Sequence, residues 1–166
     1  MPNNILIKYG SKTTLTAAVA SLASDTNLLA GIESSIIDNT TDGFDDFLIS
    51  GKITTGTSPT ASRQVEVWAV AWDGSGWPDV FDGTTSAETI TSSDIKNAIC
   101  RPIVITTTNN TSDRPYPFTG ISLRNAFDGG LPSRVVLFVV HNTGVNLNST
   151  AANHELSYQG VYPQVQ

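Results

Sequence analysis

The chain has 166 residues, a length that fits one domain, and only 14% of them are charged, against about 25% in ordinary soluble domains. Nine Lys and Arg against fifteen Asp and Glu give a net charge of −6, and without a basic cluster the chain has no electrostatic source for binding nucleic acid. No apolar run approaches the ~18 residues needed to span a membrane. We therefore expect a soluble protein made without a signal peptide, with one β-sandwich domain over residues 1–166.

Strands are predicted where apolar residues alternate with polar ones, or where β-branched residues gather between turn signals. In the first half of the chain this gives strands at 5–9, 28–37, 44–54 and 64–72. The strand at 28–37 is expected to be interrupted near Gly31 by a bulge or a bend. The segment 13–24 fits both a strand and one face of a helix, and its threonines favour the strand.

The second half contains the one predicted helix of more than a single turn. Ser92 or Ser93 is expected to cap it, and Pro102 ends it after residues 94–100. The other elements expected here are a strand at 103–108, a proline-containing loop at 109–117, a helical turn at 122–127 and a last strand at 154–162.

The stretch Arg134–Asn142 organises the prediction of the fold. Its valines, Leu137 and Phe138 place apolar side chains on both faces of a strand, so both faces must be covered, one by the core and the other by a second layer or another subunit. We therefore predict an all-β fold, an antiparallel β-sandwich that is jelly-roll-like and has one or two short helices.

Aromatic side chains give one candidate surface. Trp68 and Trp72 lie on the same face of the predicted strand, and Trp77 follows in the next irregular segment. Large core residues, a protein–protein interface and a platform for sugar rings all explain this pattern. We carry Trp68, Trp72 and Trp77 forward as possible interface or ligand-patch residues.

Metal-ligating residues are present but poorly spaced. Asp73, Asp79 and Asp82 alternate with glycines as in a calcium loop, yet the spacing does not match an EF-hand. His141 and His154 flank a polar loop that could bring them together, but no third ligand is evident. We expect histidines that hydrogen-bond to loop carbonyls, and no bound metal.

Catalytic signatures are not found in the sequence. The single cysteine, Cys100, lies between apolar and basic neighbours and is expected to be buried. No nucleophile, base and orienting group form a recognisable set. The sequence therefore predicts a protein that is not an enzyme and has no cofactor.

Three stretches resemble small structural proteins of tailed bacteriophage particles that accompany the major capsid protein. They are Trp77–Ile90, Ser112–Phe118 and His141–Asn148, and the Tyr9-Gly-Ser start adds to the likeness. The resemblance implies a decoration or cement protein that binds outside a capsid lattice, usually as a symmetric oligomer. It supplies no catalytic motif and no residue-level site.

The surface chemistry is compatible with such a role, because a surface rich in hydroxyl and amide groups loses little solvation when it is docked. The expected partners are the major capsid protein and further copies of the chain, as a dimer or trimer, with no nucleic acid and no membrane. The expected location is the capsid exterior of the virion, after synthesis in the host cytoplasm. The alternative is a lectin-like, carbohydrate-binding β-sandwich module of a phage fibre or receptor-binding protein.

Overall fold

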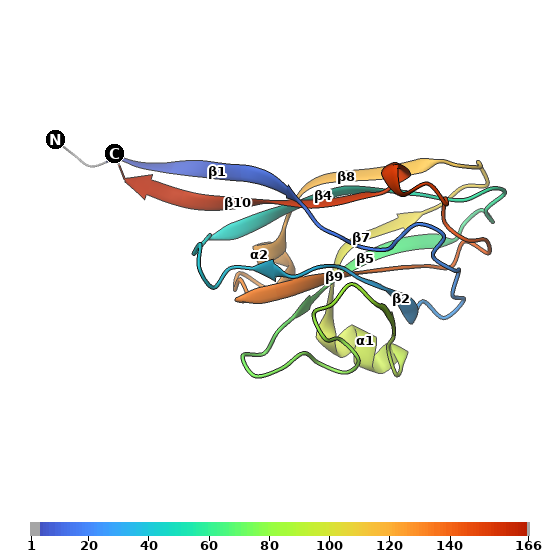
Figure 1. Ribbon diagram of the computed structural model, residues 1–166, viewed down its shortest axis with the longest axis horizontal. Helices are drawn as coiled ribbons and strands as arrows, with labels where there is room; N and C mark the ends of the chain where they lie inside the picture. Colours follow the sequence, from blue (N-terminus) through green and yellow to red (C-terminus); the bar gives the residue numbers. More distant parts are fainter. Residues whose placement is uncertain (1–3, 166) are drawn as a thin grey trace.

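In the computed structural model, which describes residues 4–165, the strands form two antiparallel sheets that face each other (Figure 1). The first sheet has the order β1 (Ile5–Thr14), β10 (Glu155–Val165), β4 (Asp46–Thr54) and β8 (Pro115–Ser122). The second has the order β6 (Ala87–Thr89), β2 (Ala30–Glu33), β9 (Arg134–His141), β5 (Gln64–Ala71) and β7 (Cys100–Thr107), and β3 (Ile37–Asp38) also pairs with β9.

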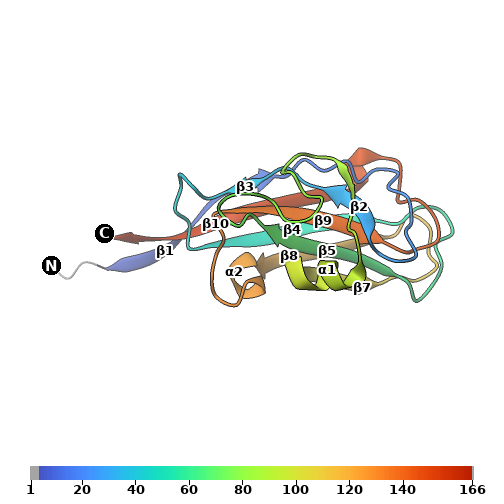
Figure 2. The same cartoon turned by 90° about the horizontal axis from the view of Figure 1, so that it is seen from below.

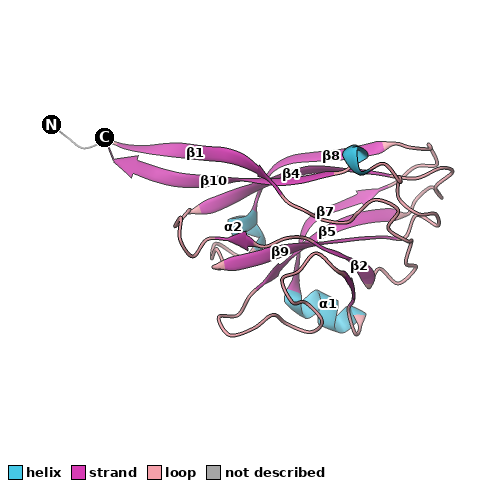
Figure 3. Cartoon of the chain, viewed as in Figure 1, coloured by secondary structure: helices cyan, strands magenta, loops and turns pink. Residues whose placement is uncertain are grey.

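The strand pairings are nested along the chain, as in a jelly roll. β1 pairs with β10, β2 with β9, β4 with β8 and β5 with β7. The chain is thus folded back on itself as one long antiparallel hairpin that is wrapped into two layers. Helical structure in the described residues is short: α1 (Ser93–Ile99), α2 (Leu123–Ala126) and a 3₁₀ turn at Ala151–Asn153 (Figure 3). The prediction of an all-β, jelly-roll-like sandwich with short helices is confirmed.

Both faces of β9 are buried, as its sequence predicts. Val135, Leu137 and Val139 pack into the main core between the two sheets. Val136, Phe138 and Val140 pack into a second cluster on the opposite face of the second sheet. The chain itself supplies the cover there, through α1 and the largely irregular segment 73–86, so no other subunit is needed to bury β9 (Figure 1).

The predicted strand at 13–24 is wrong beyond Thr14, where β1 ends. Leu15 and Val19 are buried in the main core, but the backbone leaves the first sheet. Leu15 N still donates to Leu156 O, whereas Thr16 O already accepts from Ser35 N. A segment that crosses from one sheet to the other cannot stay in one hydrogen-bonded ladder. The spacing of the apolar residues in 13–24 therefore reflects their burial in the core and not a regular strand.

The expected loop at 109–117 is wrong at its end, because β8 begins at Pro115. Its prolines are tolerated because β8 is an edge strand of the first sheet, so one side of it needs no partner. The expected bulge in 28–37 is present but lies at 34–36, between β2 and β3. There Ser34 exchanges both hydrogen bonds with Leu137, using its hydroxyl oxygen to accept from Leu137 N at 2.9 Å.

Candidate functional site

A two-stranded ribbon projects from one end of the sandwich. β4 pairs with β10 only as far as Val161, whereas β1 continues alongside β10 to Val165. Residues 5–9 of β1 and 161–165 of β10 therefore form a two-stranded extension of the first sheet, in which only Val161, at its base, still pairs with β4. Both views show this extension (Figures 1 and 2). We call these two segments the ribbon.

One face of the ribbon is apolar throughout and open to solvent. The cross-strand pairs Ile5–Val165, Ile7–Pro163 and Tyr9–Val161 lie on it, because paired residues of antiparallel strands share a face. The exposed fractions are 67% for Ile5, 58% for Ile7, 60% for Tyr9 and 62% for Val165. This is the outer face of the first sheet, and we call these six residues the apolar ribbon face.

The opposite face of the ribbon points toward the interior of the sandwich. Tyr162 lies on this face, and its ring centroid is 5.6 Å from that of Phe44, which packs against the main core. Lys8, the partner of Tyr162, is on the same inner face. The ribbon is thus attached to the body by aromatic packing on one side only.

The apolar ribbon face stops where the body begins. A bulge in β1 between Tyr9 and Lys12 shifts the side-chain alternation by one residue, so that Lys12 comes to lie opposite Gln159. Lys12 forms an ion pair with Glu155, which itself lies opposite Lys52 of β4. The outer face is therefore polar and charged over the body and uncharged over the ribbon.

The structure corrects the place of Trp68 among the candidate surface residues. Trp68 is buried in the second cluster, and its Nε1 donates to Glu66 Oε2 at 2.7 Å. Lys96 of α1 donates to the same oxygen at 2.7 Å and to Leu28 O, with its Nζ 4.6 Å from the Trp68 ring centroid. Trp68 thus belongs to a buried network that fastens α1 to the second sheet, and it is not available at a surface.

Trp72 and Trp77 are half-buried and are held by separate contacts. The guanidinium of Arg134 lies 4.9 Å from the Trp72 ring centroid, and Arg134 Nε donates to Asp38 at 3.0 Å. Trp77 packs against the second cluster. The three tryptophans therefore do not form the single aromatic row that their spacing suggests.

Two of the three aspartates of the predicted calcium-like loop close local turns, and the third bonds to a more distant residue. Asp73 accepts from Ser75 and Gly76, and Asp82 accepts from Thr84 N and Oγ1. Asp79 instead accepts from Thr91 N and Oγ1. They do not converge on one point as ligands of one cation would.

Asp82 lies instead beside two glutamates that the sequence did not single out. Carboxylate oxygens of Glu33, Asp82 and Glu88 lie within 4.8 Å of one another. Glu33 is fully buried and accepts from Gly83 N at 2.8 Å and Asp82 N at 3.3 Å, while Glu88 accepts from Ser86 Oγ at 2.6 Å. Burial, with a smaller contribution from the neighbouring carboxylates, raises the pKa of Glu33 to about 7. The hydrogen bonds to Glu33 Oε1 and Oε2 and to Asp82 Oδ1 anchor the segment 82–84.

The two histidines hydrogen-bond to loops, as predicted. In the buried His141, Nε2 lies 3.0 Å from Leu22 O and Nδ1 lies 3.0 Å from Thr143 Oγ1. In His154, Nδ1 accepts from Thr54 N at 3.3 Å and Nε2 donates to Asn148 O at 2.8 Å. Burial lowers the pKa of both imidazole groups. All four ring nitrogens of His141 and His154 already take part in hydrogen bonds within the chain.

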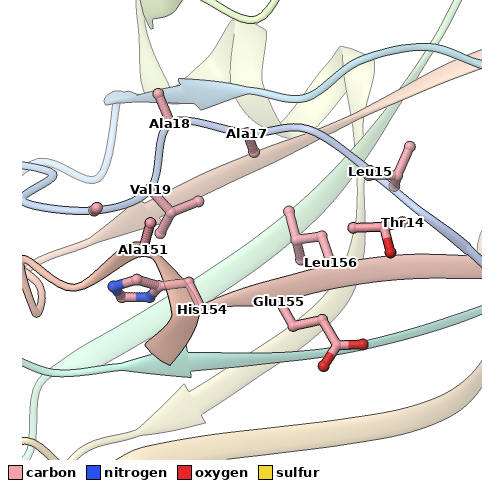
Figure 4. A pocket seen from close by; sticks show the side chains of 10 residues that line it. Thr14, Leu15, Ala17, Ala18, Val19, Ala151, His154, Glu155 and Leu156 are labelled. Atoms are coloured by element: carbon pink, nitrogen blue, oxygen red, sulfur yellow. The ribbon is translucent and has the colours of Figure 1, made fainter.

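The depressions on the described part of the chain include two with different linings. The first, about 140 Å³, is lined by residues 14, 15, 17–20, 151 and 154–156. In it His154 is already hydrogen-bonded, and Glu155 points away (Figure 4) and pairs with Lys12. The second, about 380 Å³, is polar and includes Asp113, Asn146 and Asn148. Asn148 Nδ2 donates to Asp113 at 2.7 Å, which ties together two of the loops that line it.

Comparisons with models of protein families, with curated proteins and with solved structures find no match for this chain. No helix among residues 4–165 is long and apolar enough to cross a membrane.

Sequence reasoning found the strand at 5–9 but not the apolar ribbon face. The alternation of Ile5, Ile7 and Tyr9 is the same whether that face is buried or exposed. Only the pairing shows that β10 outlasts β4 and that nothing in the described chain covers the face. The signal that the sequence does contain is the concentration of apolar side chains at two distant segments without a carboxylate in either.

Proposed function

We propose that the chain is a non-enzymatic structural protein of a tailed-phage virion, a decoration or cement protein that binds the head shell as a homo-oligomer and stabilises it. The observation that carries this proposal is the apolar ribbon face. A contiguous exposed apolar surface on an otherwise polar molecule is characteristic of a site of association.

Three further features support the same proposal. The jelly roll is an architecture that recurs in viral capsid domains. The body has few charges and many hydroxyl and amide groups, so it docks at a low desolvation penalty. The stretches Trp77–Ile90, Ser112–Phe118 and His141–Asn148 resemble small phage virion proteins.

The test is association with phage heads. We expect the purified chain to sediment with intact particles, and particles that lack it to release their DNA at a lower temperature than complete ones. If the protein stays in the supernatant, and the two kinds of particle release DNA at the same temperature, the proposal is wrong.

A carbohydrate-binding module is the second candidate, and the polar depression at Asp113 and Asn146 favours it, since carboxylate and amide groups bind sugar hydroxyls. Glycan-array binding that is lost in Asn146→Ala would support this alternative. Asn146 is exposed, so its replacement should leave the fold intact and make the loss interpretable.

A further inference from the structure

We propose that the apolar ribbon face docks against the same face of a second copy of this chain, so that two ribbons pack face to face around a two-fold axis. The inference rests on the proposed function for its setting, because it names the surface through which the homo-oligomer forms. It commits to a dimer and to a second copy as the occupant.

The size of the face fits this occupant. Four of its side chains are each about three-fifths exposed, and together they present on the order of 500 Å², as large as the biggest apolar patches on ordinary monomers. Two such faces would remove on the order of 1,000 Å² from water, which is the lower limit for a specific interface.

The distribution of charge also suits self-association. Each chain has a net charge of −6, so two copies repel if their bodies meet. The apolar ribbon face contains no acidic or basic side chain, and Lys8 points to the inner face. Because the ribbon projects from the body (Figure 2), contact through it keeps the acidic bodies apart, and separations beyond about 8 Å are screened at physiological salt.

The physics of a two-stranded ribbon calls for a second layer. An isolated pair of strands is marginally stable in water, and stability comes when an apolar face is packed. Two ribbons laid face to face would form such a layer, with sheets about 10 Å apart. A two-fold axis lets one uncharged surface serve both sides of the contact, since an isologous interface uses the same patch twice. Tyr9, a residue type enriched in interface hot spots, would lie next to the bodies.

The first test is the mass of the full chain by light scattering at 1 to 100 µM, concentrations chosen to bracket about 10 µM affinity. We expect about twice 17.6 kDa for the wild type. Ile7→Glu places a charge on the apolar ribbon face, opposite its copy, and should weaken dimerisation about 100-fold or more. Ile105→Glu is the matched control, because Ile105 is 49% exposed on β7, away from the ribbon, and it should leave the mass unchanged.

The second test is cross-linking through an introduced thiol. The only native cysteine, Cys100, is buried, and its pKa is raised to about 12, so it will not react. Because sheets packed face to face lie about 10 Å apart, too far for a direct disulfide, the probe is a short bis-maleimide that spans this gap. It should give a cross-linked dimer of Ile7→Cys in high yield, and Ile105→Cys should give none above the level of random collision. Both variants should show the wild-type circular dichroism spectrum, because both side chains are largely exposed.

The outcomes separate this inference from the proposed function. A wild-type monomer at 100 µM with no Ile7→Cys cross-link, a trimer, or a dimer that Ile7→Glu leaves intact would each overturn the inference. If the isolated chain is a monomer and Ile7→Glu abolishes binding to particles, the shell covers the face, and the decoration role stands without the inference and without a preformed oligomer. If the dimer forms as expected but never binds particles, the proposed function fails instead.

Discussion

At the scale of single residues, the most consequential group is the buried pair of Lys96 and Glu66. Lys96 Nζ and Trp68 Nε1 both donate to one oxygen of Glu66 at 2.7 Å. A buried ion pair adds little when intact, but loss of one partner leaves an uncompensated charge in the interior. Replacing either Lys96 or Glu66 alone should therefore weaken the packing of α1 on the second sheet.

A double-mutant cycle tests this. Lys96→Met should lower the free energy of unfolding by about 3–5 kcal/mol, because the Glu66 carboxylate stays buried without its cation. Lys96→Met combined with Glu66→Gln should recover a large part of that loss, since the amide oxygen still accepts from Trp68 and no charge is buried. Urea unfolding measures both values, and a double variant that is no more stable than Lys96→Met would contradict the explanation.

Glu33 should make stability depend on pH near neutrality. Its pKa in the fold is about 7, against a usual value of 4.5. The unfolded chain loses this proton first, so the contribution of Glu33 to stability is complete below pH 4.5 and is lost as the pH rises to about 7, by roughly 1–3 kcal/mol.

The measurement is the difference in unfolding free energy between the wild type and Glu33→Gln from pH 4.5 to pH 8. The wild type should lose its relative advantage as the pH rises and level off above about pH 7. Taking the difference cancels the two histidines, whose lowered pKa values act in the opposite direction. A difference that does not change with pH would show that Glu33 does not titrate in this range.

At the scale of elements, β2 depends on close approach to β9. A Cβ built on Gly31 would lie 2.3 Å from Val139 O and 2.7 Å from the Phe138 ring. Gly31→Ala should therefore force the two strands apart and lower the unfolding free energy by about 2–3 kcal/mol. Gly76→Ala, where nothing lies within 4 Å of the added atom, is the control and should change stability by less than about 0.5 kcal/mol. Equal melting temperatures for the two variants would contradict this reading of β2.

The elements also show how far sequence alone leads. β9 was predictable because its apolar residues occupy both parities of a strand, and α1 because Ser92 accepts from Ile95 N as a helix cap. β8 was missed because its prolines disfavour a strand unless the strand lies at a sheet edge. Edge position depends on pairing with β4, a contact between distant segments that no local pattern encodes.

The same limit applies to the candidate site. The residues of the apolar ribbon face come from the first and last strands of the chain, and the pairing of these two strands brings them onto one face. The tryptophans, in contrast, attracted attention by type, but Trp68 is covered by α1 from a distant part of the chain. In both cases the missing information is which segment covers which face.

At the scale of the whole molecule, dimerisation through the ribbon should be coupled to stability. Because only folded chains present the paired face, the melting temperature should rise with protein concentration, by about 3–5 °C for a 100-fold increase. Scanning calorimetry of the wild type and of Ile7→Glu measures this, and the variant should melt at a temperature independent of concentration. A wild type that behaves like the variant would argue against a dimer.

The nesting of the jelly roll affects when the adhesive surface comes into existence. The two strands that build it, β1 and β10, lie near opposite ends of the sequence and pair with each other. Lys12 and Glu155, for example, are in contact although they are 143 positions apart. Such remote partners meet late, since closing so long a loop is entropically unfavourable until the intervening layers have formed. Chains that are not yet fully folded therefore lack the paired apolar face. We expect only fully folded subunits to associate.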